Sequence, residues 1–185
     1  IHRKRVCTLT LIVEDGSGVP NANSYTSVAE ADAYFSLREN PATWTGAETA
    51  VKERALRMST AYITEQYGNR WRGVIDSDTQ GLDWPRSGVV DGDTGLYYDN
   101  NEMPKRLLNA TAEVAVRYIA GTALRPDVEP GDGNVTNSTI SVGSISITED
   151  FVGMATTAPV FPIVKQQLRS LLTDAGATLL HRVTR

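Results

Sequence analysis

Apolar side chains recur every three or four residues in four segments of this chain, which is the spacing of one face of an α-helix. In the first segment, Ser27 and Glu30 have the capping-box spacing, in which the hydroxyl accepts from one backbone amide and the carboxylate accepts from another. A helix is therefore predicted to begin after Ser27 and to end before Pro41. Its inward face is Val28, Ala31, Tyr34 and Phe35.

The same capping pattern, formed by Thr45 and Glu48, precedes the second segment, and Gly68 supplies its exit. The third segment follows Pro104, a residue favoured at the start of a helix, and ends at Gly121. The fourth is predicted over residues 161–175. The inward positions are Val51, Ala55, Met58 and Tyr62 in the second segment, Leu107, Leu108, Thr111, Val114, Ala115, Tyr118 and Ile119 in the third, and Val164, Leu168, Leu171 and Leu172 in the fourth.

A different pattern separates the third and fourth helices. Residues 125–138 are rich in proline, glycine and polar side chains and are expected to form a loop. Apolar residues then alternate around Gly143-Ser144, which predicts a β-hairpin near residues 139–148. Such a hairpin is marginal by itself in water, so it needs the protein's own helices or, the interpretation that we favour, a neighbouring copy. The predicted hairpin interface is Ile140, Val142, Ile145 and Ile147.

The expected fold class is therefore mainly α: a small bundle of about four helices with one β-hairpin, long loops and terminal arms. A length of 185 residues with 41% hydrophobic residues suits one domain. We assign this domain to residues 11–175, an N-terminal extension to residues 1–10, and a C-terminal arm or helix extension to residues 176–185. The basic start and its short apolar run are expected to belong to the mature protein. Because no stretch approaches about 18 apolar residues, the membrane is not an expected partner.

The sequence offers little support for catalysis. Cys7 is the single cysteine, and His2 and His181 lie at opposite ends, so neither a thiolate zinc site nor a histidine constellation is expected. The aspartates around residues 91–99 lack the ligand spacing of a calcium loop, although a metal-dependent enzyme remains a weaker alternative. We therefore predict no enzyme activity, no catalytic residues, no metal and no cofactor.

Arginines flank two tryptophans in the middle of the chain. Arg70 and Arg72 bracket Trp71, an arrangement that suits stacking on single-stranded bases. The net charge of -4 favours the other interpretation, in which the tryptophans are packing anchors of the bundle. In that interpretation Trp84 is buried, Pro85 fixes the path of its loop, and Arg86 pairs with a nearby carboxylate. The candidate subunit and loop anchors are Trp71, Trp84, Pro85 and Arg86, and the candidate DNA-channel residues are Arg70, Arg72, Lys105 and Arg106.

Four stretches together resemble a family of tailed-phage proteins. They are LIVEDGSGVPNANSYTSVAEADAYF at 11–35, RWRG at 70–73, LDWPRSGV at 82–89 and EMPKRLLNATAEVAVRY at 102–118. Members of that family resemble head-to-tail adaptors, also called head completion or neck proteins, and some are labelled as DnaT-like single-stranded DNA-binding domains.

The resemblance implies a structural virion protein that forms a ring of twelve copies under the portal protein in the phage neck. Such a ring would be assembled in the host cytoplasm, would bind the next neck or tail protein, and would surround the genomic DNA without reading its sequence. It would also send one terminal arm into the portal. A single-stranded DNA-binding replication protein of the DnaT-like kind is the alternative. The candidate residues of the portal arm are Leu179, Leu180, Arg182, Val183 and Arg185.

Overall fold

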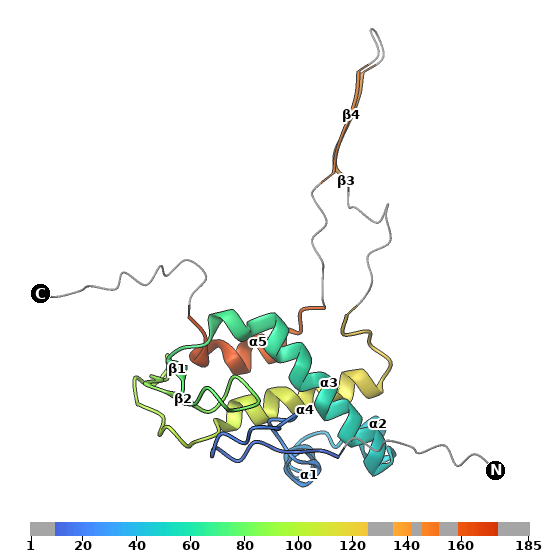
Figure 1. Ribbon diagram of the computed structural model, residues 1–185. Coiled ribbons are helices and arrows are strands. Elements are labelled where there is room, and N and C mark those ends of the chain that lie inside the picture. The colour runs from blue at the N-terminus through green and yellow to red at the C-terminus, as the bar shows by residue number, and fades with distance from the viewer. Residues whose placement is uncertain (1–9, 126–134, 142–145, 152–158, 174–185) are drawn as a thin grey trace, which may run out of the picture. The chain divides into compact units, whose positions relative to one another are not determined.

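The structure is a computed structural model that describes residues 10–125, 135–141, 146–151 and 159–173 (Figure 1). It confirms a mainly helical fold with one extended β-hairpin. The chain divides into two compact units, Ile1–Thr122 with Phe161–Arg185, and Ala123–Val160. In chain order the helices are α1 (Val28–Ser36), α2 (Ala42–Thr45), α3 (Thr49–Tyr67), α4 (Lys105–Ile119) and α5 (Pro162–Leu168), with 3-10 turns η1 (Gly68–Arg70) and η2 (Arg169–Leu171).

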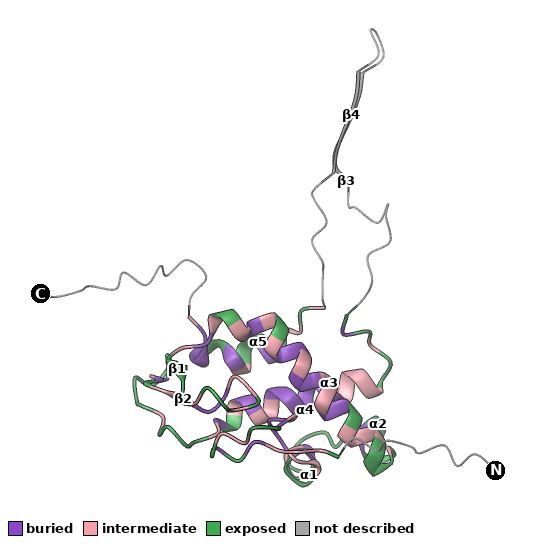
Figure 2. Cartoon of the chain, viewed as in Figure 1, coloured by how far each residue is buried: buried purple, intermediate pink, exposed green. Residues whose placement is uncertain are grey.

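Helices α3 and α4 form the centre of the first unit, and α1, α2 and α5 pack around them. Buried residues follow the sides on which these helices face one another (Figure 2). The amphipathic stripe of α4 explains its position, since Leu107, Val114 and Ala115 have no exposed surface. A cluster of buried residues joins four helices: Ala31, Phe35, Trp44, Ala55, Leu56, Ala112 and Ala115.

The helix starts agree with the sequence only in part. The capping box of Ser27 and Glu30 is confirmed, with both reciprocal hydrogen bonds present. The second capping box is wrong, because Thr45 ends the short helix α2 and Glu48 caps α3 without a side-chain hydrogen bond. The Thr45 hydroxyl instead donates to the Pro41 carbonyl within its own helical turn.

The fourth predicted helix is shorter than its apolar pattern suggests. Helix α5 ends at Leu168 and continues only as the turn η2. The backbone then becomes extended at Leu172, which bridges Trp71, and the Thr173 amide donates to the Arg70 carbonyl. Pairing with the segment after α3 therefore gives hydrogen bonds to the backbone amides and carbonyls that would otherwise have been paired within a longer helix.

The hairpin of the second unit consists of β3 (Val135–Ser141) and β4 (Ser146–Phe151). The strands are antiparallel, and Ile140 is opposite Ile147. The hairpin is longer than the predicted 139–148 because a register shift between Val135 and Asn137 lets the ladder continue to Phe151. Val142 and Ile145, two of the predicted interface residues, lie outside the described residues.

The shape of the N-terminal segment depends on one buried carboxylate. Glu14 Oε1 accepts from the amides of Gly16 and Gly18, and Oε2 accepts from that of Val19. Gly16 has a φ of 99°, and a Cβ there would lie 2.0 Å from the Asn101 carbonyl oxygen. The Glu-Asp-Gly-Ser-Gly sequence thus forms a tight loop against the segment that precedes α4.

Candidate nucleic-acid interface

The two tryptophans selected from the sequence lie inside the packed body. Trp84 has no exposed surface, and Trp71 is 5% exposed. Their rings meet edge to face with centroids 5.9 Å apart, and Trp71 Nε1 donates to Asp83 Oδ2 at 3.1 Å. Because both indoles are covered, neither offers a face on which a nucleobase can stack.

Arg86 forms its hydrogen bonds with backbone carbonyls, and the carboxylate near it, that of Asp83, interacts with its charge without a hydrogen bond between the two side chains. Arg86 lies in β2 (Arg86–Ser87), which pairs with β1 (Val74–Ile75). Its guanidinium donates to the carbonyls of Arg72 at 2.8 Å, Gly73 at 2.9 Å and Asp83 at 3.2 Å. Five donors on one planar group suit this role, because two chain segments, residues 72–73 and Asp83, present three carbonyls to it.

The four predicted DNA-channel residues separate into two pairs. Arg72 Nε donates to the Leu172 carbonyl at 2.9 Å, and Arg70 Nε is buried without a hydrogen bond, so this half-buried pair is engaged within the fold. Lys105 is exposed at the start of α4, and Arg106 follows it with its side chain 38% exposed. The second pair is therefore the one available to a ligand.

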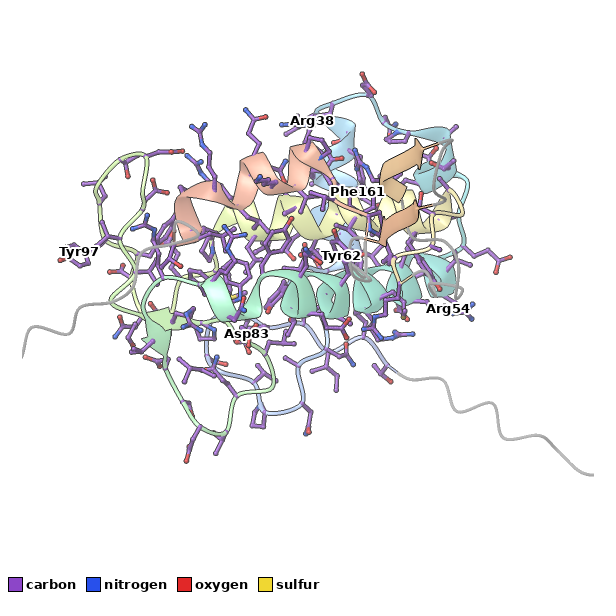
Figure 3. The ribbon with its side chains drawn as sticks, turned by 90° about the horizontal axis from the view of Figure 1, so that it is seen from above. Arg38, Arg54, Tyr62, Asp83, Tyr97 and Phe161 are labelled. Carbon is purple, nitrogen blue, oxygen red and sulfur yellow. The ribbon has the colours of Figure 1, made fainter. Side chains whose placement is uncertain are left out.

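Arg106 joins two other arginines around an open hollow of about 440 Å³, here called the arginine groove. Arg38 comes from the turn after α1, Arg106 from the first turn of α4, and Arg169 from η2. Figure 3 shows Arg38 beside α5, on the side of the body away from Arg54. The groove is lined by Arg38, Asp93, Arg106, Asn109, Ile163, Gln166, Gln167 and Arg169.

One carboxylate organises two of these arginines. Asp93 lies 2.7 Å from Arg106 Nη1 and 3.3 Å from Arg169 Nη2. The hydrogen bond from Arg106 is the main reason that the pKa of Asp93 is lowered, so this group is ionised at neutral pH. Arg38 instead lies 4.7 Å above the Tyr34 ring, and no carboxylate of the described residues pairs with it. Three arginines and one aspartate leave the groove with an excess of two positive charges.

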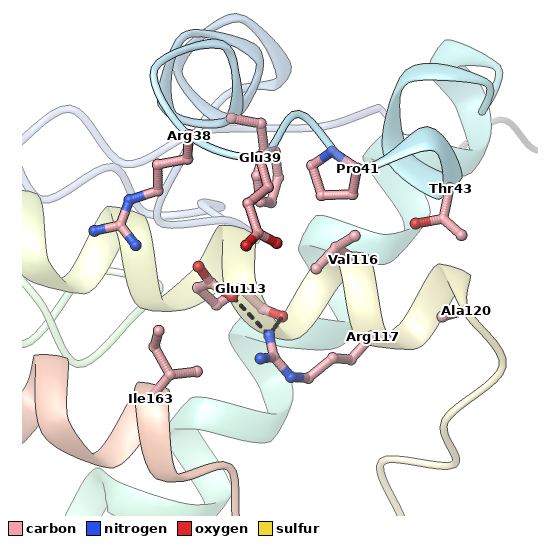
Figure 4. Close-up of a pocket in the computed structure, with 10 residues that line it drawn as sticks. Arg38, Glu39, Pro41, Thr43, Glu113, Val116, Arg117, Ala120 and Ile163 are labelled. Atoms are coloured by element: carbon pink, nitrogen blue, oxygen red, sulfur yellow. Dashed lines mark hydrogen bonds and ion pairs between the residues drawn. The ribbon is translucent and has the colours of Figure 1, made fainter.

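Two more hollows continue from the arginine groove along α4. The larger, called the end pocket, has a volume of about 690 Å³ and shares Arg38 and Ile163 with the groove (Figure 4). The smaller, of about 390 Å³, shares Asn109 with it and includes Lys105. The side of the body formed by α1, α4 and α5 is thus hollowed over several adjoining sites, as an elongated ligand requires.

Sequence reasoning missed Arg38 and Arg169. Neither lies beside an aromatic residue or in a basic run, and their meeting depends on how α1 and η2 pack against α4. The available signal was weak, because Arg38 lies near the end of its predicted helix whereas Arg169 lies in the middle of the predicted helix 161–175, and many solvent-exposed arginines occupy such positions.

Among the described residues no group of three or more histidine, cysteine, aspartate or glutamate side chains is arranged to hold a metal ion. The same part of the chain has no helix with the length and apolar character needed to cross a membrane.

A family model described as "Putative DnaT-like ssDNA binding protein" matches residues 9–185. The comparison with curated proteins gave no match, and the comparison with solved structures gave none. The DnaT-like part of the resemblance is thus confirmed, whereas the head-to-tail adaptor role stays a prediction. Since the match covers almost the full length, the chain belongs to this DnaT-like family.

Proposed function

We propose that this chain binds single-stranded DNA and that the arginine groove contacts the phosphate backbone. The observation that carries the proposal is the convergence of Arg38, Arg106 and Arg169 from three separate elements in a chain of net charge -4. Such a local excess of positive charge, in an acidic protein, attracts a polyanion to one place. The family description supports the choice of single-stranded DNA as the ligand.

The groove has the chemical groups that a phosphodiester needs. A guanidinium donates two parallel hydrogen bonds to phosphate oxygens, and the amides of Asn109 and Gln166 add neutral donors beside it. Asp93 fixes two arginines in place but also competes with the phosphate for them. We therefore expect binding of moderate strength that depends on backbone charge.

Binding of a fluorescent oligonucleotide, followed by anisotropy at low salt, tests this proposal. A variant with Arg38, Arg106 and Arg169 changed to alanine is expected to bind at least about tenfold more weakly, because three phosphate contacts are lost. Arg54→Ala is the matched control, since Arg54 is exposed on α3 and lies outside the groove. Equal affinity of the triple variant and the wild type would refute the groove as the DNA site.

The second candidate is a structural subunit of the phage neck, the head-to-tail adaptor that the sequence resembles. The observation in its favour is that β3 and β4 lie in a compact unit of their own. A two-stranded hairpin gains little stability alone, so this unit suits docking on another copy or another protein. In this proposal the partners are further copies in a ring of twelve, the portal and the next neck or tail protein, and the location is the virion neck. No catalysis is involved.

Electron microscopy of intact particles that carry the labelled protein separates the two candidates. The adaptor proposal expects label at the vertex between capsid and tail. Label absent from the particles, together with oligonucleotide binding by the purified chain, would instead favour the replication role.

A further inference from the structure

We infer that the end pocket receives one unstacked nucleobase of the DNA strand and prefers bases that carry an amino group. This inference rests on the DNA-binding function proposed above, and it assigns a base-selective site next to the backbone contacts. The pocket residues that carry the argument are Arg38, Glu39, Pro41, Thr43, Val116 and Ile163.

The position of the pocket relative to the groove is the first step. Arg38 and Ile163 line both hollows, so they form the shared wall between them. A phosphate bound by the groove arginines therefore lies next to the pocket, with only this shared wall between them. Its attached base can reach the pocket without a second backbone site, because phosphate and base belong to the same nucleotide.

The walls suit the flat faces of a base. Pro41, Val116 and Ile163 supply apolar surface around the opening, and Phe35 lies beneath them with 3% exposure. Arg38 adds a planar guanidinium that lies 4.7 Å from the centre of the Tyr34 ring, and a guanidinium can stack on a base. A volume of about 690 Å³ falls within the range of small-molecule sites, so a base fits inside it.

The free polar groups decide which base fits. Glu113 is occupied, since its carboxylate accepts from Tyr34 Oη at 2.8 Å and from Arg117 Nη1 at 2.7 Å. No hydrogen bond within the described part of the chain uses the Glu39 carboxylate, which Figure 4 shows directed into the pocket. Arg117 also lines the pocket but is paired with Glu113. The open site is thus the Glu39 carboxylate beside Arg38, with the Thr43 side chain at the far rim.

An acceptor-only carboxylate discriminates between base edges. It accepts from the amino group of cytosine, and adenine and guanine also present amino groups on edges that are free in a single strand. Thymine has no amino group, and its single donor on this edge, N3–H, lies between two carbonyl oxygens that the negative charge of Glu39 repels. The pocket is therefore expected to disfavour thymine.

Anisotropy with labelled oligo-dC and oligo-dT of about 15 nucleotides, a length that covers one protein-sized site, tests the inference. Oligo-dC is expected to bind at least about threefold more tightly, because one good base contact is lost with thymine. Glu39→Gln should bring the ratio close to one, since the amide can donate to a thymine carbonyl. Glu102→Gln removes the same charge at an exposed residue that lines none of the three hollows, and should keep the preference.

The outcomes separate this inference from the proposed function. Equal binding of the two oligonucleotides, or a preference that survives Glu39→Gln, would overturn the base pocket while leaving the backbone groove intact. Failure of the wild type to bind either oligonucleotide would overturn both.

Discussion

Arg106 Nη1 lies 2.7 Å from Asp93 Oδ2, and this ion pair fixes the start of α4 to the loop that follows β2. The same carboxylate contacts Arg169 from η2. Asp93 therefore orients two of the three groove arginines, and its negative charge offsets part of their attraction for a phosphate. Orienting the arginines favours phosphate binding, whereas the negative charge weakens it. A substitution of Asp93 therefore shows which of the two effects is larger.

Changing Asp93 to asparagine is expected to tighten oligonucleotide binding by about two- to fivefold at low salt, because one competing charge is removed from the groove. The measurement is a titration by anisotropy. Asp78→Asn, at an exposed loop position, changes the net charge equally and should alter affinity much less. Weaker binding by Asp93→Asn would mean that orientation of the arginines matters more than the local charge.

Trp84→Ala is expected to destabilise the helical unit by about 3–5 kcal/mol, the usual cost of removing a large buried ring. Trp84 has no exposed surface and packs edge to face against both Trp71 and Tyr98. Urea denaturation followed by circular dichroism measures the effect. Tyr97→Ala is the comparison, since Tyr97 is 77% exposed and should change stability little. A similar midpoint for the two variants would contradict the role of Trp84 as an anchor.

The carboxyl group of Asp91 makes the stability of the fold depend on pH. Burial raises its pKa, but hydrogen bonds from the amides of Thr94 and Asp93 and from the Tyr98 hydroxyl outweigh this and lower the pKa to about 2. The ordinary value is 3.8. A carboxyl group with a lowered pKa in the folded state stabilises the protein above its unfolded pKa, and this contribution is lost as the pH falls through the folded pKa.

Asp91→Asn should therefore be about 2 kcal/mol less stable than the wild type at pH 7, and this difference should shrink between about pH 4 and pH 2. Urea denaturation at several pH values provides the measurement. A difference that stays constant down to pH 2 would show that the Asp91 charge contributes nothing to folding.

Deletion of residues 137–149 tests the role of the hairpin. These residues belong to the second compact unit, so helical circular dichroism should be retained and the melting temperature should fall by only a few degrees. Self-association, measured by light scattering on a size-exclusion column, should decrease if the hairpin docks on a neighbouring copy. Loss of helical signal would place the hairpin in the core instead.

The helices could be predicted because the local sequence signals and the tertiary packing favour the same structure there. The stripe of α4 and the capping box of Ser27 reflect short-range spacing, which the sequence states directly. The end of α5 could not be predicted, because it is set by pairing of Leu172 with Trp71, about a hundred residues earlier in the chain. Tertiary pairing of this kind overrides a continuing apolar pattern.

The candidate site was less accessible to sequence reasoning than the fold. Tryptophans beside arginines allowed either base stacking or the packing role that we favoured, and the structure buries Trp71 and Trp84 while Arg86 binds backbone carbonyls. Only Arg106 and Lys105 of the predicted basic residues border the hollows along α4. The charge of a residue can be read from a sequence, whereas its exposure to solvent depends on the packing of distant segments.

Salt dependence of oligonucleotide binding tests the central claim most directly. If Arg38, Arg106 and Arg169 each neutralise one phosphate, the logarithm of the binding constant should fall with the logarithm of salt concentration at a slope of about -2. The triple alanine variant should have a slope near zero, and Arg54→Ala should keep the wild-type slope. The same steep slope in the wild type and the triple variant would contradict the account, because the phosphate contacts would then lie elsewhere.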